Sequence, residues 1–232
     1  SAVSRAVSAV SNLTIEETER LGIPALSLRT NTGKTHRTLE DIIQIIDAAD
    51  ASAEAKALAK RVFNRIQKAE ETVHQSHHVH FHEVGADDAI ADVLGSCTAL
   101  LSLQPEAVKV LPLSVGFGTL TCSHGVMPVP APATAEILKD SGLEVLIGGF
   151  EGELCTPTGA ALLSEFAASY PAPEGAGKLI ALGRGAGSRN PQDHPNILSV
   201  YRMESGADEH TIDVLETNVD DISGEILAET LS

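Results

Sequence analysis

Residues 38–75 constrain the fold most, because they read as two amphipathic helices joined by a very short connection. Thr38 is the expected N-cap of the first helix, and Asp41 three residues later completes a capping-box-like start. The apolar residues of this helix recur at helical intervals, at Leu39, Ile42, Ile43 and Ile46. The segment therefore predicts a capped helix that buries one face.

The second helix, "SAEAKALAKRVFNRIQKAEETVH", begins with Ser52 as its N-cap and is rich in strong helix formers. Its apolar stripe consists of Leu58, Val62, Phe63 and Ile66. Because only a few residues separate the two helices, we predict that they pack together as a helical hairpin.

Helix-like and strand-like segments alternate loosely along the rest of the chain. Residues 1–22 begin as a helix, and residues 23–38 read as a strand followed by a glycine-containing loop. Further helices are expected within 86–103, 129–140, 154–170 and 223–232, and strands within 108–122, 178–190, 196–204 and 211–221. This alternation predicts a mixed α/β (α+β) fold, with the helical hairpin packed on a mixed sheet with helices.

We predict three parts in this chain. Residues 1–75 form a mainly helical N-terminal part, and residues 76–217 form a mixed α/β core that carries the metal and anion sites. Residues 218–232 are the start of a further C-terminal domain. The chain lacks an initial Met and ends inside a helix-like segment, so we take it to be part of a longer protein.

Composition excludes several classes of protein. A net charge of -16 argues against nucleic acid as a partner, because phosphate contacts require clustered Lys and Arg. No apolar run reaches the roughly 18 residues of a membrane span, and the N-terminus lacks the layout of a secretory signal. Three isolated cysteines, Cys97, Cys122 and Cys155, predict buried thiols in a reducing compartment rather than disulfides. We therefore expect a cytoplasmic protein.

Histidines crowd one short stretch, because five of the nine lie in the nine positions from His74 to His82. Imidazole is the commonest transition-metal ligand, so the crowding predicts a metal site. In "HHVHFHEV", His78, His80 and His82 alternate with apolar residues, which predicts a strand with three imidazoles on one face. The alternative is a solvated polar face of an edge strand.

The ligand set of this site stays open. Neighbouring histidines on one face lie about 7 Å apart at their backbones, so two of the three can share one ion. The remaining ligand is Glu83, His77, an acid of the following helix, or a group from a neighbouring subunit. Asp88 and Asp92 share a face of that helix, where satisfying the helix dipole explains them equally well. An imidazole-and-carboxylate set suits nickel, zinc or iron.

Three segments are candidates for holding an anionic ligand. "CTPTGAALL" predicts a capped helix start that offers hydroxyl and amide groups at the positive helix end, although plain capping explains it too. "GRGAGSRN" combines glycines, which let a ligand approach the backbone, with arginines that match phosphate or carboxylate. A histidine precedes the proline-stiffened loop in "SHGVMPVPAPAT". The residues in question are Thr156, Thr158, Gly159, Arg184, Arg189 and His124.

Five segments together resemble a known family. "VHFHEVGADDAIADVLG", "HGVMPVPAPATAEILK", "ELCTPTGAALL", "GRGAGSRNPQDHPNIL" and "ETNVDD" occur in the order seen in nickel-insertion proteins of the LarC type. The resemblance implies insertion of Ni²⁺ into pyridinium-3,5-bisthiocarboxylate mononucleotide, with CTP and Mn²⁺ or Mg²⁺ used by the full-length protein. The implied product is the nickel-pincer cofactor of lactate racemase. Apo lactate racemase is then the downstream partner, and a homo-oligomer is implied as well.

The resemblance also implies roles for individual residues. The family motif "HFHEVGA" falls on residues 80–86 and matches His80, His82 and Glu83. With His78 from the strand pattern, these residues are the predicted metal ligands. Glu83 or Asp88 is implied as the acceptor of the substrate's ring proton. The implied substrate-binding residues are His124, Thr156, Thr158, Gly159 and Arg189. The family usually has Tyr where Arg184 stands, and Thr and Asp where Ser188 and Asn190 stand.

Two other functions remain open on the sequence. A non-catalytic nickel carrier or store would need the histidines but no anion sites. A structural oligomer could instead use the histidines as a pH-sensitive interface.

Overall fold

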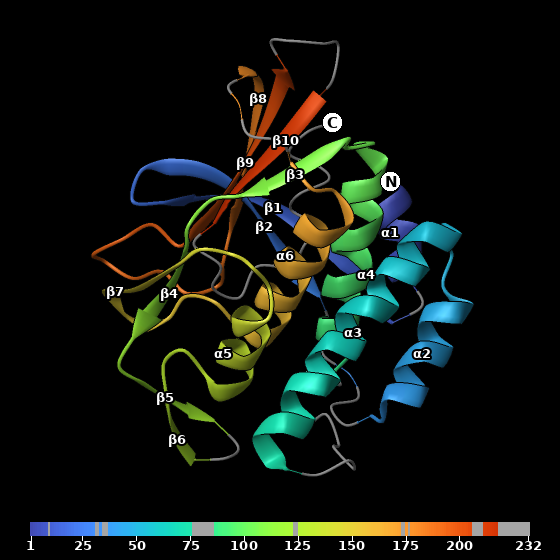
Figure 1. Ribbon diagram of the computed structural model, residues 1–232. Helices are drawn as coiled ribbons and strands as arrows, with labels where there is room; N and C mark the ends of the chain where they lie inside the picture. The colour runs from blue at the N-terminus through green and yellow to red at the C-terminus, as the bar shows by residue number, and fades with distance from the viewer. Residues whose placement is uncertain are drawn as a thin grey trace.

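The computed structural model describes residues 1–8, 10–30, 33, 37–75, 86–122, 125–172, 175, 177–205 and 211–217. The helices are α1 (Ala2–Val7), α2 (Leu39–Ala48), α3 (Ala53–His74), α4 (Asp87–Ser102), α5 (Pro132–Lys139) and α6 (Pro157–Ser169) (Figure 1). The strands are β1 (Leu13–Arg20), β2 (Ile23–Thr30), β3 (Ala107–Val110), β4 (Leu113–Phe117), β5 (Thr119–Cys122), β6 (Gly125–Pro128), β7 (Val145–Glu153), β8 (Gly177–Ala186), β9 (Ile197–Ser205) and β10 (Thr211–Thr217). Within the described ranges, no helix is long and apolar enough to cross a bilayer.

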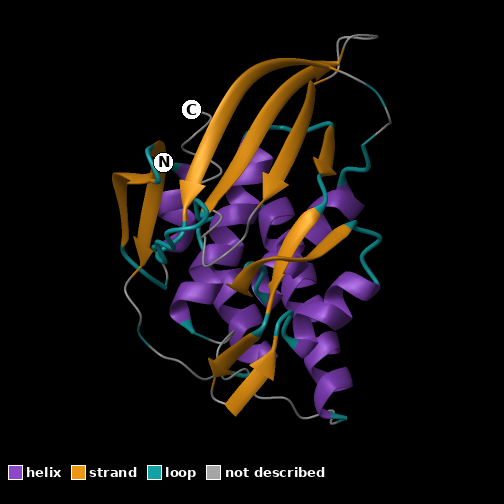
Figure 2. Ribbon diagram, turned by 90° about the vertical axis from the view of Figure 1, so that its left-hand side faces the viewer, coloured by secondary structure: helices purple, strands orange, loops and turns teal. Residues whose placement is uncertain are grey.

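Six strands form one mixed sheet in the order β1–β2–β8–β9–β10–β3. β2 pairs parallel with β8, and β10 pairs parallel with β3, while the other neighbours are antiparallel. The remaining strands make two separate pairs, parallel β4–β7 and antiparallel β5–β6. Figure 2 shows the helices gathered on one side of the large sheet. The prediction of a mixed α/β fold is confirmed.

The helical hairpin forms as its local signals predict. The Thr38 hydroxyl accepts from the Asp41 amide at 3.2 Å, and the Asp41 carboxylate accepts from the Thr38 amide at 3.0 Å, so the capping box is complete. The Ser52 hydroxyl accepts from the Ala55 amide at 3.1 Å and starts α3. α2 packs against α3, as a hairpin requires.

α3 carries the centre of the hydrophobic core. Its predicted stripe is buried throughout, at Leu58, Val62, Phe63 and Ile66. α3 packs on α4, α5 and α6, and the same core continues to Leu198 and Val200 of β9. The core therefore extends across residue 75, and the division of the chain into three parts stays a prediction.

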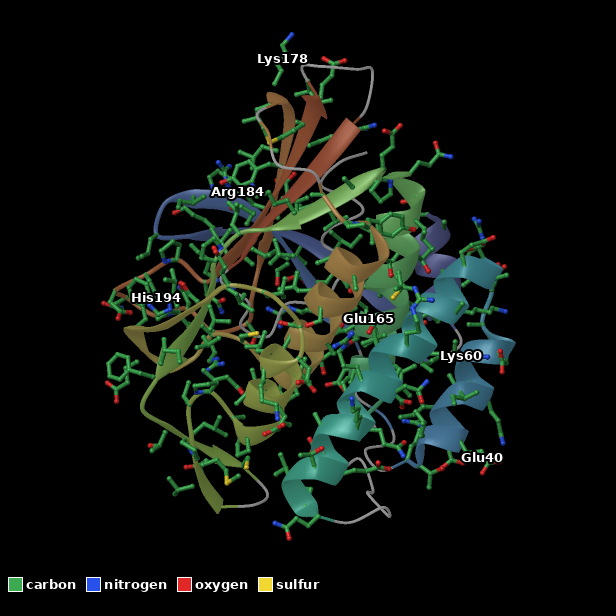
Figure 3. All side chains as sticks on the ribbon, in the orientation of Figure 1. Glu40, Lys60, Glu165, Lys178, Arg184 and His194 are labelled. Carbon is green, nitrogen blue, oxygen red and sulfur yellow. The ribbon has the colours of Figure 1, made fainter. Side chains whose placement is uncertain are left out.

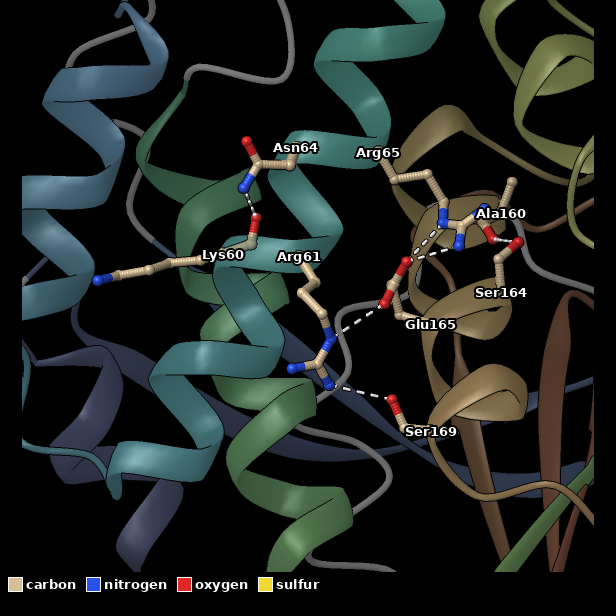
Figure 4. Close-up of polar contacts among 8 residues, drawn as sticks. All are labelled: Lys60, Arg61, Asn64, Arg65, Ala160, Ser164, Glu165 and Ser169. Atoms are coloured by element: carbon tan, nitrogen blue, oxygen red, sulfur yellow. Dashed lines mark hydrogen bonds and ion pairs between the residues drawn. The ribbon is translucent and has the colours of Figure 1, made fainter.

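A partly buried ion-pair cluster joins α3 to α6 (Figure 4). The Glu165 carboxylate of α6 accepts from Arg61 Nε at 3.2 Å and from Arg65 Nε at 2.7 Å. Arg61 also donates to the Ser169 hydroxyl at 3.0 Å. Both arginines come from α3, so one carboxylate fixes the two helices against each other.

The sequence pattern fails to predict three strands. β1, "LTIEETER", is rich in charged residues, and it becomes a strand by pairing along its whole length with β2. β7 carries Gly148 and Gly149 with positive φ, a composition typical of a loop. β6 forms in the segment that follows His124, for which the sequence predicts a proline-stiffened loop. Gly116 lies inside β4 with positive φ, where a side chain would strike the Gly152 carbonyl of β7.

Candidate functional site

Helices α4 and α6 begin at the same end of the helical layer. α6 ends beside β3, where the Val108 amide donates to the Tyr170 carbonyl at 2.7 Å. α4 ends at Ser102, shortly before β3 begins at Ala107. The two helices contact each other, so both N-termini point away from β3, toward the lower half of Figure 1. The positive ends of two helix dipoles therefore open on one side of the molecule.

The start of α6 is built as the sequence predicts, with one correction. Thr156 is the N-cap, its hydroxyl accepts from the Gly159 amide at 3.2 Å, and Pro157 takes the first helical position. Gly159 is buried and its amide is used by the cap, so it does not supply one of the amide groups that the sequence offers to an anion. Thr158 is half-buried at the second helical position. The anion-binding groups of this turn therefore reduce to the Thr158 amide and hydroxyl.

The glycine-rich segment folds back onto the strand that leads into α6. The exposed guanidinium of Arg189 donates to the Glu153 carbonyl at 2.9 Å, three residues before the Thr156 cap. Asn196 Nδ2 donates to the Arg189 carbonyl at 3.1 Å and so holds the loop that carries it. The structure thus brings together two anion-binding candidates that the sequence offers separately. Arg184 lies further back, within β8 (Figure 3).

A buried histidine that the sequence reasoning did not single out fastens the same loop. The His194 ring lies against the Phe150 ring of β7, with ring centroids 4.3 Å apart. Its Nδ1 lies 2.9 Å from the Asp193 carboxylate, and Figure 3 labels it beside the β7 segment. His194 is only 5% exposed, so we assign it to loop packing. No local pattern could reveal this contact, because Phe150 lies far away in the sequence.

α4 opens with two adjacent acids that differ in their surroundings. Asp88 is half-buried, and its carboxylate accepts from the Ala89 amide at 2.8 Å. Asp87 is buried and pairs with the Arg37 guanidinium, and the sequence reasoning missed it because its partner lies 50 residues earlier. Asp92 follows Asp88 by one turn within α4, so these two share a face as predicted.

The structure describes both ends of the histidine run but not the run itself. The predicted metal ligands lie outside the described residues, and so does the predicted substrate-binding residue His124; these ligands are His78, His80, His82 and Glu83. α3 ends at His74 with Gln75 as a left-handed C-cap, and α4 begins at Asp87. Over the part of the chain that is described, no three His, Cys, Asp or Glu side chains are placed to hold a metal ion. A site with three such ligands therefore needs at least one residue outside the described ranges.

Two of the three cysteines are buried as the sequence predicts, and the prediction is wrong for Cys122. Cys97 and Cys155 are fully buried, and burial raises the pKa of both thiols well above the ordinary range. Both thiols therefore stay protonated at neutral pH and are not available as thiolate ligands. Cys122, at the end of β5, is half-buried.

This architecture defines the class of the protein. It is a mixed α/β protein in which the N-termini of α4 and α6, with their polar side chains, lie at one end of the helical layer. The whole chain, residues 1–232, matches the family model described as "Nickel insertion protein", and the chain belongs to this family. The resemblance carried by the five sequence segments is thereby confirmed.

Curated relatives agree with the family. A Methanosarcina barkeri protein, whose name refers to nickel insertion, is 41% identical over 223 residues, which cover 92% of this chain and 55% of the relative. A similarly named Methanococcoides burtonii protein is 43% identical over 224 residues, which cover 93% of this chain and 55% of that relative. A Nocardioides protein is named pyridinium-3,5-bisthiocarboxylic acid mononucleotide nickel insertion protein. It is 42% identical over 215 residues, which cover 90% of this chain and 54% of that relative. The chain thus spans about half the length of these relatives, and no solved structure matches it.

Proposed function

We propose that this chain binds Ni²⁺ at its histidine run and inserts it into pyridinium-3,5-bisthiocarboxylate mononucleotide, as part of a longer protein that uses CTP with Mn²⁺ or Mg²⁺. The proposed metal ligands are His78, His80, His82 and Glu83. One observation carries the proposal: the run leads directly into the start of α4, which shares its side of the molecule with the start of α6. The printed name of the Nocardioides relative supports the choice of substrate.

Ni²⁺ is the cargo in this reaction, and the protein must both bind it and give it up. Imidazole and carboxylate ligands displace water from the ion but yield it to stronger donors. Insertion forms two nickel–sulfur bonds and one nickel–carbon bond. The ring C–H bond breaks, its electron pair stays on carbon to bind nickel, and the proton passes to a carboxylate, for which Glu83 and Asp88 are the candidates. No oxidant or reductant is required.

The substrate phosphate is proposed to rest between the start of α6 and the β8–β9 loop. Thr158 supplies a hydroxyl and an amide at the positive helix end, and Arg189 supplies a guanidinium from a loop tied to Glu153. Thr156 and Gly159 shape this turn through their mutual hydrogen bond. His124 is proposed to contact the substrate as well. The proposed product is delivered to apo lactate racemase, and the working protein is proposed to be a homo-oligomer.

Nickel binding is the first test. Calorimetry should compare this chain with a His80→Ala, His82→Ala variant, with zinc as a competitor. We expect the variant to lose tight nickel binding, because two imidazoles are removed from the proposed ligand set. Equal nickel affinity in both proteins would remove the metal role from the histidine run.

A non-catalytic nickel carrier is the second candidate. It is favoured by one observation: the Gly159 amide bonds to the Thr156 cap, so this amide cannot bind an anion, and a carrier needs no anion site. The two functions differ in their need for the anion site. In the full-length protein, Thr158→Val and Arg189→Ala should abolish nickel transfer to the mononucleotide while nickel affinity stays unchanged. Arg29→Ala is the matched control, because Arg29 is an exposed arginine of β2 that pairs with Glu16 at the surface. Normal transfer by both site variants would remove Thr158 and Arg189 from the proposed substrate site, whereas nickel binding without any transfer by the unsubstituted full-length protein would favour the carrier.

A further inference from the structure

Asn196, at the base of the β8–β9 loop, is buried although its side chain is strongly polar. The residue is only 1% exposed, and its Nδ2 donates to the Arg189 carbonyl at 3.1 Å. Its Oδ1 is buried too and has no hydrogen-bond partner among the described residues. A buried acceptor without a donor destabilises the folded state, whereas an apolar side chain of similar shape would fill the same space without that cost. The bond to Arg189 is therefore the feature that explains an asparagine at this position.

The base of the loop is closed without the Asn196 side chain. The Gly187 amide donates to the Asn196 carbonyl at 3.2 Å, which joins the two ends of the loop through backbone atoms. The buried guanidinium of Arg20, at the end of β1, donates to the Gly187 carbonyl at 2.6 Å. Ile197, the next residue after Asn196, is buried in a small apolar cluster with residues of β2 and β8. The Asn196 side chain is thus free to serve the loop itself, and the backbone that it holds is that of Arg189.

Arg189 is held at its backbone and at its side chain. Asn196 binds its carbonyl, and its guanidinium donates to the Glu153 carbonyl at 2.9 Å, three residues before the Thr156 cap of α6. The residue is exposed, so packing does not set the direction of its side chain. Without the Asn196 bond the backbone at Arg189 could turn, and the guanidinium would spend less time at the start of α6.

We propose that Asn196 is a positioning residue for substrate binding: it holds the backbone of Arg189 so that the guanidinium stays at the start of α6, where the substrate phosphate is proposed to rest. This inference rests on the proposed function, in which Arg189 binds that phosphate. The unpartnered Oδ1 is the cost of placing an amide donor at a buried position. Removing the amide should therefore weaken substrate binding without weakening the fold.

Asn196→Leu separates these two effects, because leucine keeps the branched shape of asparagine and has no polar group. In the full-length protein we expect the KM for the mononucleotide to rise about tenfold with kcat unchanged, since the lost binding is shared by substrate and transition state. Nickel affinity should stay unchanged, and the urea midpoint should equal or exceed that of the parent, because a buried unpaired acceptor is removed. Asn196→Ala adds no volume to the loop and should raise KM by a similar factor.

Two controls test whether Asn196 acts through Arg189. Thr98→Val removes another buried bond from a side chain to the backbone, the one that the Thr98 hydroxyl donates to the Leu94 carbonyl at 2.8 Å within α4, and it should leave KM unchanged. In an Arg189→Lys background, Asn196→Leu should change KM by less than about twofold, because no guanidinium remains to be positioned.

The outcomes distinguish this inference from the proposed function. If KM stays at the parent value in Asn196→Leu and Asn196→Ala while Arg189→Ala loses transfer, positioning is refuted and the substrate site stands. If Asn196→Leu raises KM equally in the Arg189→Lys background, Asn196 acts without Arg189 and the inference is again refuted. If Arg189→Ala transfers nickel normally, Arg189 leaves the substrate site and the inference falls with it. A rise in KM that requires the arginine, with none in Thr98→Val, supports positioning.

Discussion

The Glu165 cluster offers a direct measure of how α3 and α6 are held together. A hydrogen bond to a charged group contributes about 1.5–3 kcal/mol net when it is buried. The Glu165 side chain is 10% exposed and Arg65 is 24% exposed, whereas Arg61 is 50% exposed and its bond is largely screened by water. Glu165→Gln should therefore lower the free energy of unfolding by about 2 kcal/mol, mainly through the bond to Arg65. For a chain of this size the melting temperature should fall by about 4–8 °C.

Urea unfolding followed by circular dichroism measures this loss, and a double-mutant cycle assigns it. Arg65→Met, Glu165→Gln and the double variant should give a coupling free energy of about 1–2 kcal/mol, and the cycle with Arg61→Met should give clearly less. Glu16→Gln is the control, because it breaks an exposed pair with Arg29 and should leave the urea midpoint nearly unchanged. A coupling below about 0.3 kcal/mol between Arg65 and Glu165 would refute the reasoning, since it would mean that the pair adds nothing beyond packing.

Two further predictions concern the thiols and the start of α2. In the folded protein Cys97 and Cys155 should resist a colorimetric thiol reagent while Cys122 reacts, and fast reaction of more than one thiol would contradict the burial described here. Burial raises the pKa of Cys97 and Cys155, so these thiols ionise only when the protein unfolds. The free energy of unfolding should therefore fall as the pH rises above the pKa of a free cysteine. A Cys97→Ala, Cys155→Ala variant should lose this part of the pH dependence. Thr38→Ala should lower the free energy of unfolding, measured in urea, by about 1 kcal/mol, because it removes the capping box. Thr38→Ser should keep most of this stability. Equal stability of the parent and both variants would show that the cap is dispensable.

The sequence predicts the helices well because their signals are local. Thr38, Ser52 and Thr156 each cap the helix that the sequence assigns to them, and each bond is made within three residues. The stripe of α3 is equally local, since helical spacing alone places its apolar residues on one face. These features depend on short-range geometry, which the order of residues determines directly.

Strands and long-range polar contacts are harder to predict because their partners are distant. β1 carries four charged residues among eight and becomes a strand only through its pairing with β2. The Arg37–Asp87 pair and the Arg65–Glu165 bond join residues 50 and 100 positions apart, with no pattern that links them. The proximity of Arg189 to the start of α6 likewise depends on how the β8–β9 loop folds back. The candidate site could thus be proposed in pieces, but its assembly required the fold.

If the proposed function holds, the burial of two thiols in this chain has a chemical consequence for nickel delivery. Thiolates bind nickel more strongly than imidazole and carboxylate, so an accessible protein thiolate would compete with the two sulfurs of the proposed substrate. Cys97 and Cys155 are withdrawn from that competition by burial, which keeps them protonated. On the proposed function, histidine and carboxylate ligands hold the ion weakly enough to give it up. Nickel then moves toward the two sulfurs of the substrate because they bind it more strongly than imidazole and carboxylate do.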